Sequence, residues 1–321
     1  MTLHELRPRA LPSATSPQPS PTVQRLAHWA QAAPLQIALR HRRQGEWFAW
    51  RWIDVLREVE QLAAGLRQHG FSARSRLAVS GAYETDLLLL SLAAQASGGT
   101  VVGVPRPASS AALVAQLQTL RPTHGFVQDR RDLPHWQGCH EQVAGLRVLI
   151  TAQPPLVDSG PLPVLGISHL LGERPSPTTL FGLPAGSDAT LLWVEEGTDW
   201  EAGLEVILGQ WLSSGQALAF PESPGSAARD RRAVAPTGLL LSSARLQVLA
   251  HEIEARLPPP GSWRRRLCDW TIEQPRRGLR RLLKQRVQRL LGFENLRSIW
   301  QAPNHTQAHH PWTLEPGKDV A

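Results

Sequence analysis

Three small groups of residues in this sequence carry side chains that could do chemistry. His305, His309 and His310 lie close together near the carboxyl end, as metal ligands often do. The pairs Ser242-Ser243 and Cys139-His140 each offer a nucleophile. None of them has the support that chemistry needs: no residues to orient the histidines, no G-x-S-x-G motif, and a thiol and imidazole that are merely adjacent. We therefore expect a helix-capping role for the serines, and we predict no catalytic residue and no metal site.

The most strongly charged stretch runs from Trp263 to Leu291, where ten arginine and lysine residues face two acidic ones. The whole chain carries +7, so the remainder is close to neutral. From Pro275 onward, apolar residues recur on one side of a predicted helix with arginines opposite, so residues 275–291 read as a cationic amphipathic helix. Such a face is usually only solvated. Its functional alternative is contact with an anion or membrane surface, through Arg276, Arg277, Arg280, Arg281 and Lys284.

Nucleic acid is a disfavoured partner for this stretch, because aromatic side chains that would stack on bases do not interleave with the arginines. Trp263 and Trp270 lie beside the basic residues and suit the interface of an anionic membrane. The sequence thus leaves an anionic membrane surface open as a partner.

Composition limits the class of protein. The chain has 321 residues, of which 42% are hydrophobic, enough for a substantial core. Two cysteines give no disulfide framework, and no stretch reads as a signal peptide or a membrane span. We therefore expect a cytoplasmic protein, peripheral at the inner membrane if the basic helix binds lipid.

The elements that would position these residues alternate between strands and helices. Residues 76–81 form an apolar run closed by glycine, residues 86–96 are apolar on every face, and residues 100–105 are rich in valine. This succession predicts two parallel strands joined by a buried helix that crosses over one sheet right-handedly. The same alternation elsewhere predicts an α/β fold of layered sheets with helices on both faces.

Local signals mark the boundaries of other elements. Thr22 or Ser20 can cap a first helix, Asp54 can cap another, and two strands flanking residues 44–46 predict a hairpin. We predict a disordered Pro/Ser-rich tail (1–22), a first α/β subdomain (23–153), an irregular connection (154–188), a second α/β subdomain with basic helices (189–300) and a flexible tail (301–321).

Two blocks of sequence resemble AMP-forming acyl-CoA synthetases, and the second is similar to the middle of the long-chain members. The resemblance covers most of residues 34–300, although each motif is weak alone. It implies the fold of the N-terminal part of the adenylate-forming ligase core. The matching segments are residues 37–40, 47–52, 62–66, 76–79 and 93–99 in the first block, and residues 210–215, 219–224, 236–237, 263–267 and 289–292 in the second.

The departures from this family carry as much information as the matches. In the family, a TSGTTG-x-P-K-G loop after a strand holds the phosphates of ATP through backbone N–H groups and a lysine. Here residues 191–193 are followed by Glu195 and Glu196, which repel a triphosphate, and no lysine lies nearby. The adenine- and ribose-binding motifs and the domain with the catalytic lysine, expected after Trp300, are also not recognisable. The chain thus resembles a truncated, divergent member.

The resemblance therefore implies a catalytically inactive acyl-CoA synthetase-like protein that uses none of the family's cofactors ATP, Mg²⁺ and coenzyme A. It also implies that acyl-chain or partner binding is retained, with a fatty-acyl tunnel wall at Trp200 and Trp211 and with a protein partner or a homo-oligomer as alternatives. One alternative is an active fatty acid–CoA ligase component, an AMP-forming acid–thiol ligase completed by another chain. The other is a peripheral membrane or anion-binding adaptor that uses the basic helix 275–291.

Overall fold

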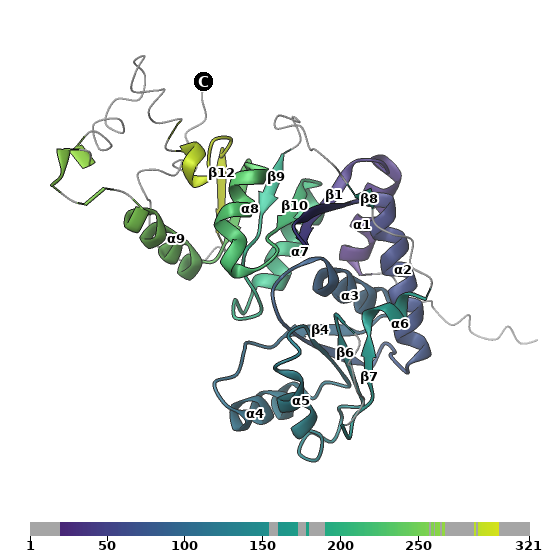
Figure 1. Ribbon diagram of the computed structural model, residues 1–321. Helices are drawn as coiled ribbons and strands as arrows, with labels where there is room; N and C mark the ends of the chain where they lie inside the picture. Colours follow the sequence, from purple (N-terminus) through teal and green to yellow (C-terminus); the bar gives the residue numbers. More distant parts are fainter. Residues whose placement is uncertain are drawn as a thin grey trace, which may run out of the picture.

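In the part of the chain that the computed structural model describes, two sheets and the helices that cover them are stacked in alternating layers (Figure 1). The residues that the structure describes are 20–153, 160–172, 178–179, 190–256, 258–259, 261–263, 265–266, 286 and 288–301.

The smaller sheet is a five-stranded parallel sheet with the order β4-β3-β5-β6-β7. Its centre is the predicted β-α-β unit, formed by β3 (Arg76–Ser80), α3 (Thr85–Ala96) and β4 (Thr100–Gly103). Nearly every residue of α3 is buried, as its uniformly apolar sequence predicts. The remaining strands are β5 (His124–Val127), β6 (Val148–Thr151) and β7 (Val164–Gly166).

The larger sheet has seven strands in the order β12-β11-β9-β10-β1-β2-β8. The predicted hairpin is formed by β1 (Ile37–Arg43) and β2 (Glu46–Arg51). Gln44 and Gly45 connect them with φ angles of 51° and 79°, the two positive values that a two-residue type I′ turn requires. The other strands are β8 (Thr178–Thr179), β9 (Leu191–Trp193), β10 (Ala217–Phe220), β11 (Gly238–Leu241) and β12 (Ser298–Gln301).

The amino-terminal hairpin belongs to the same sheet as the strands from the second half of the chain. β1 pairs in parallel with β10, so that Leu39 lies beside Leu218. The predicted division into subdomains 23–153 and 189–300 is therefore wrong for the sheets. Periodicity reveals that a segment is a strand, but it carries no information about which distant strand will pair with it.

Helices form the layer between the two sheets. α1 (Pro21–Ala32), α2 (Trp52–Gln68) and α7 (Gly203–Ser214) pack there with α3, and their apolar side chains share one core cluster with strands of both sheets. Three tryptophans from three helices stack inside this layer. Trp29 lies on Trp52, and Trp52 lies on Trp211, with ring centroids 5.8 and 5.1 Å apart.

The outer faces of both sheets are also covered. α4 (Ser110–Leu120) and α5 (Leu133–Gly138) bury Leu113, Leu117 and Trp136 against the five-stranded sheet. α8 (Ala227–Val234), which follows a 3₁₀ turn at Pro224–Ser226, and α9 (Ser243–Arg256) pack on the seven-stranded sheet. The expected fold class, layered α/β sheets with helices on both faces, is confirmed.

The structure also corrects several expected boundaries. Ser20, one of the two predicted caps, accepts a hydrogen bond from the Val23 backbone N–H (3.4 Å), so α1 begins inside the predicted tail 1–22. Asp54 is not the N-cap of α2. It lies at the third helical position and accepts from the backbone N–H of Arg51, the capping residue (3.1 Å).

The predicted irregular connection 154–188 is wrong for residues 160–172, which contain β7 and α6 (Ile167–Leu171). α6 packs on α2 where Gly65 leaves room for the backbone at Leu170. These elements have three and five residues, too few for a periodic pattern to reveal them. Among the helices that the structure describes, none is long and apolar enough to cross a membrane.

Candidate functional site

The two sheets meet at the carboxyl ends of their strands, where the fold builds a cavity of about 310 Å³. The loops that follow β3, β5, β9 and β10 line it. In open α/β sheets, ligands bind in the crevice outside the carboxyl ends of the strands, so this is the place to look for a site.

The loop after β9 is fixed to the loop after β3 by backbone hydrogen bonds. The Thr198 N–H donates to the Gly81 carbonyl (2.8 Å), and the Tyr83 N–H donates to the Glu196 carbonyl (2.8 Å). The Tyr83 hydroxyl donates to the Trp200 carbonyl (2.9 Å), and burial raises the pKa of this phenol, so it stays protonated and can donate. The loop is thus a rigid connection between the sheets.

Glu195 lies at the start of this loop with its side chain 1% exposed. Three side chains donate to its carboxylate: Trp193 through Nε1 (2.7 Å), Arg231 through Nη1 (2.9 and 3.1 Å) and Arg245 through Nε (3.1 Å). The arginines come from α8 and from the first turn of α9. A buried carboxylate is tolerated when its oxygens are hydrogen-bonded and its charge is paired, and both conditions are met here.

Glu196 is the second carboxyl group of the loop. Burial raises the pKa of Glu196, while hydrogen bonds from Ser242 partly oppose this shift. The Ser242 hydroxyl accepts from the Arg245 backbone N–H (3.0 Å), so the predicted helix-capping role of this serine is confirmed.

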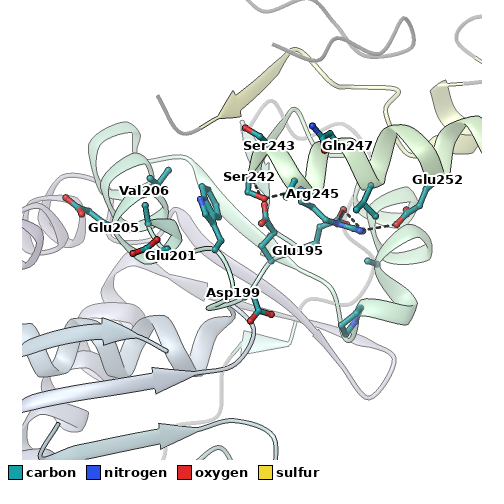
Figure 2. A pocket seen from close by; sticks show the side chains of 18 of the residues that line it. Glu195, Asp199, Glu201, Glu205, Val206, Ser242, Ser243, Arg245, Gln247 and Glu252 are labelled. Atoms are coloured by element: carbon teal, nitrogen blue, oxygen red, sulfur yellow. Dashed lines mark hydrogen bonds and ion pairs between the residues drawn. The ribbon is translucent and has the colours of Figure 1, made fainter. Parts of the chain in front are cut away.

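A larger, open groove of about 1360 Å³ lies beside the cavity, between α7 and α9 (Figure 2). Trp200, Val206 and Val248 supply apolar surface, and among the described residues Arg245 is the one basic residue that lines the groove. Six acidic residues line the same groove, namely Glu195, Glu196, Asp199, Glu201, Glu205 and Glu252.

The residues of this region do not fit a triphosphate. A phosphate-binding loop presents free backbone N–H groups, whereas here those of Thr198, Trp200 and Gly203 donate to carbonyls of the protein. The cavity is also lined by acidic residues with Arg106 as its basic residue, and the described residues contain no lysine. ATP and its Mg²⁺, which the family resemblance implies, therefore have no matching cradle at this loop.

The structure separates the two predicted acyl-pocket residues. Trp200 lines the groove between α7 and α9. Trp211 lies in the central core, where it is 0% exposed and stacks on Trp52. It is not among the described residues that line the groove or the smaller cavity. The tunnel-wall interpretation of Trp211 is corrected to core packing, because an apolar pattern in a helix does not distinguish a core face from a pocket face.

Of the other residues singled out in the sequence, some are described by the structure and others lie outside its described part. Cys139 is buried, its thiol donates to the His135 carbonyl (3.1 Å), and burial raises its pKa, all of which oppose thiolate chemistry. The described residues contain no cluster of acidic, histidine or cysteine side chains that could hold a metal ion. The proposed contact residues Arg276, Arg277, Arg280, Arg281 and Lys284, and the histidines His305, His309 and His310, lie outside the described residues.

Four basic residues of the charged stretch are described, namely Arg265, Arg266, Arg286 and Arg289, and two of them form ion pairs. Arg265 contacts Glu254 (2.6 Å) and Arg289 contacts Glu294 (2.6 Å). Sequence reasoning missed Arg231 and Arg245 as partners of Glu195. They lie 36 and 50 residues after Glu195 in the sequence, the first on α8 and the second in the first turn of α9. No motif or spacing in the sequence indicates that either arginine would contact Glu195.

No protein-family model matches the sequence, and no curated protein matches it. Solved structures match the fold. The adenylation domain of a carboxylate reductase from Mycobacterium chelonae has a TM-score of 0.62 at 13% identity, over 87% of this chain and 53% of that one. The A-PCP didomain of a carboxylic acid reductase from Segniliparus rugosus, in complex with AMP, has a TM-score of 0.63 at 14% identity, over 89% and 49%.

The acetoacetyl-CoA synthetase from Streptomyces lividans is a third similar structure, with a TM-score of 0.55 at 18% identity over 73% of this chain and 44% of that one. The chain therefore spans about half the length of these structures. At these identities the likeness concerns the fold, and the expected fold, that of the N-terminal part of the adenylate-forming ligase core, is confirmed.

Proposed function

We propose that this chain is a non-activating, ligand- or partner-binding protein built on the adenylate-forming ligase fold. The observation that carries this proposal is the loop after β9, where the resemblance expects the ATP phosphate loop. Glu195 and Glu196 occupy it, and the N–H groups of Thr198 and Trp200 already have acceptors.

Electrostatics supports the same conclusion. Bringing a triphosphate to this loop would place it against two carboxyl groups in a partly buried site, where charge repulsion is screened less than in water. The charge of Glu195 is balanced by two arginines, Arg231 and Arg245. Because both guanidinium groups already donate hydrogen bonds to Glu195, they are not available to bind a phosphate.

Binding would take place in the groove between α7 and α9. Its apolar surface at Trp200, Val206 and Val248 suits an acyl chain or an apolar partner side chain. Its six acidic residues against Arg245 disfavour a free fatty acid and favour a neutral acyl ester or amide.

The test is a pyrophosphate-release assay with ATP, Mg²⁺, coenzyme A and a series of fatty acids, with an acyl-CoA synthetase as the positive control. We expect no release above background, and no saturable binding of ATP by calorimetry. Turnover by the purified chain would refute the proposal. A fluorescence titration through Trp200 with neutral long-chain acyl esters tests the groove, and a Trp200→Leu variant identifies the signal of this residue among the other tryptophans.

A second candidate is a ligase component completed by another polypeptide, and β12 is the observation that favours it. β12 pairs with β11 on one side, and its outer edge has no partner strand among the described residues. Trp300 on this strand is 42% exposed. An unpaired strand edge with an exposed apolar side chain can pair with a strand of another polypeptide. Pyrophosphate release that requires an added polypeptide would favour this candidate over the first.

A further inference from the structure

The surroundings of Glu195 have the composition of an anion site. Arg231 is 2% exposed on its side chain and Trp193 is fully buried, so both donors are fixed by the core. Arg245 is 22% exposed and reaches the same carboxylate from α9 (Figure 2). Planar guanidinium groups and an indole N–H match an oxyanion in charge and in hydrogen-bond geometry.

The surrounding protein holds these donors in place independently of Glu195. The Arg231 guanidinium lies over the ring of buried Phe293, 4.9 Å from its centroid, and Arg231 Nε donates to the Leu291 carbonyl (3.5 Å). Arg245 also pairs with Glu252 (3.0 Å). The donors would therefore remain near their present positions if the Glu195 side chain were absent.

The charges make such a vacancy unfavourable. Both guanidinium groups donate to the Glu195 carboxylate, and Arg245 also pairs with Glu252, so removing the Glu195 side chain takes one buried negative charge and a shared hydrogen-bond acceptor away from the two arginines. An external oxyanion that entered the space would restore both the charge balance and the hydrogen bonds.

We propose that Arg231, Arg245 and Trp193 form an oxyanion-binding site that the chain fills with its own Glu195 carboxylate, and that takes up inorganic phosphate or a small carboxylate when that side chain is removed. This inference rests on the proposed function in one respect, since it identifies what occupies the loop in place of a phosphate ligand. A tethered carboxylate has the advantage of a high effective concentration, so external anions do not displace it in the native chain.

The test is chemical rescue of a Glu195→Ala variant of the full chain. Melting temperature and titration calorimetry are measured with phosphate, with acetate and with chloride at matched ionic strength. We expect the variant to melt below the native chain and to be stabilised saturably by phosphate and acetate, by about 5 to 10 °C at a concentration about 100 times Kd. Chloride should have no saturable effect, and the native chain should bind neither oxyanion.

Two further variants make the result specific. A double variant with Glu195→Ala and Arg245→Met should lose the rescue, because one of the two guanidinium groups is gone. Glu254→Ala removes the partner of Arg265 at a more exposed ion pair and should show no anion-dependent gain. Equal effects of phosphate on the native chain and on Glu195→Ala would overturn the proposal, since they would indicate general salt stabilisation.

If Glu195→Ala does not fold in chloride, the yield of refolded protein is compared in phosphate, acetate and chloride. Recovery in the two oxyanions alone supports the site, and failure in all three overturns it. Failure of the proposed function would instead appear as pyrophosphate release by the native chain, which is measured in a separate assay.

Discussion

At the scale of one residue, Glu196 makes a contribution of known sign to the pH dependence of stability. Burial raises its pKa above the value in the unfolded chain, about 4.3 for a glutamate. A raised carboxyl pKa means that the folded state favours the protonated form. The stability contributed by this group is therefore fully present below the unfolded pKa and is lost as pH rises through the folded pKa.

A Glu196→Gln variant tests this assignment. The amide oxygen still accepts from the Ser242 backbone N–H, and the variant has no ionisation at this position. We expect its free energy of unfolding to gain on that of the native chain as pH rises from 4.5 to 7.5, measured by urea denaturation. Glu205→Gln, at an exposed position in the same groove, is the control and should stay within about 0.5 kcal/mol of the native chain at each pH. A difference between Glu196→Gln and the native chain that does not change with pH would contradict the assignment.

The loop after β9 is the element that joins the two sheets, and it depends on one glycine. A Cβ at Gly197 would come within 2.6 Å of the Gly81 carbonyl oxygen, which is backbone and cannot rotate away. Gly197 also forms an isolated antiparallel bridge with Ala82, so the loops approach most closely at this point.

We therefore expect Gly197→Ala to destabilise the protein by about 1 to 3 kcal/mol, in the range of overpacking at a tight contact. Gly209→Ala is a matched control on α7, because a Cβ there meets nothing within 4 Å. An alanine inside a helix is favoured over glycine, so this variant should gain about 0.5 to 1 kcal/mol. Thermal and urea unfolding measure both changes, and equal effects of the two substitutions would exclude the close contact as the cause.

How well the sequence predicted each element depended on its length and on its partners. The β-α-β unit and the hairpin were predictable, because apolar runs, a buried helix and a Gln44-Gly45 turn are local signals. β7 and α6 are too short for such signals, and α8 is a short helix in which four of the eight residues are charged. Local patterns record what a segment is, and pairing partners are a property of the whole fold.

The candidate site was predictable only in its acidic half. Glu195 and Glu196 stand out because they follow a strand directly, where the family resemblance leads one to expect a phosphate-binding sequence. Arg231 and Arg245 balance the charge of Glu195, but they come from helices that are remote in the sequence. Because an arginine in a helix usually keeps its guanidinium group in water, nothing in the sequence indicates that these two lie in the interior. The prediction that Trp211 lines a pocket was wrong for a similar reason, because its burial against Trp52 depends on tertiary packing that the sequence pattern does not show.

At the scale of the whole molecule, the two sheets share one core. The largest apolar cluster contains Leu77 and Phe126 of the five-stranded sheet together with Leu192 and Leu218 of the seven-stranded sheet. The helices between them contribute to the same cluster, so neither sheet can lose its inner cover without exposing the other.

We therefore expect the two sheets to unfold in one cooperative transition. Calorimetric and van't Hoff enthalpies should agree, and far- and near-ultraviolet circular dichroism should give coincident curves. Gly197→Ala also tests this expectation. Loosening the loop should lower the midpoint temperature of unfolding, but unfolding should remain a single transition. Two resolved transitions in the native chain would contradict a shared core.

The tryptophan stack at the centre of the helical layer gives the protein an optical signature. The ring planes of Trp29, Trp52 and Trp211 are inclined by only 24° and 22° to their neighbours. We expect this fixed packing to give a near-ultraviolet circular dichroism band that requires α1, α2 and α7 to be docked together. A loss of this band while the far-ultraviolet spectrum persists would report that these three helices have separated while remaining helical.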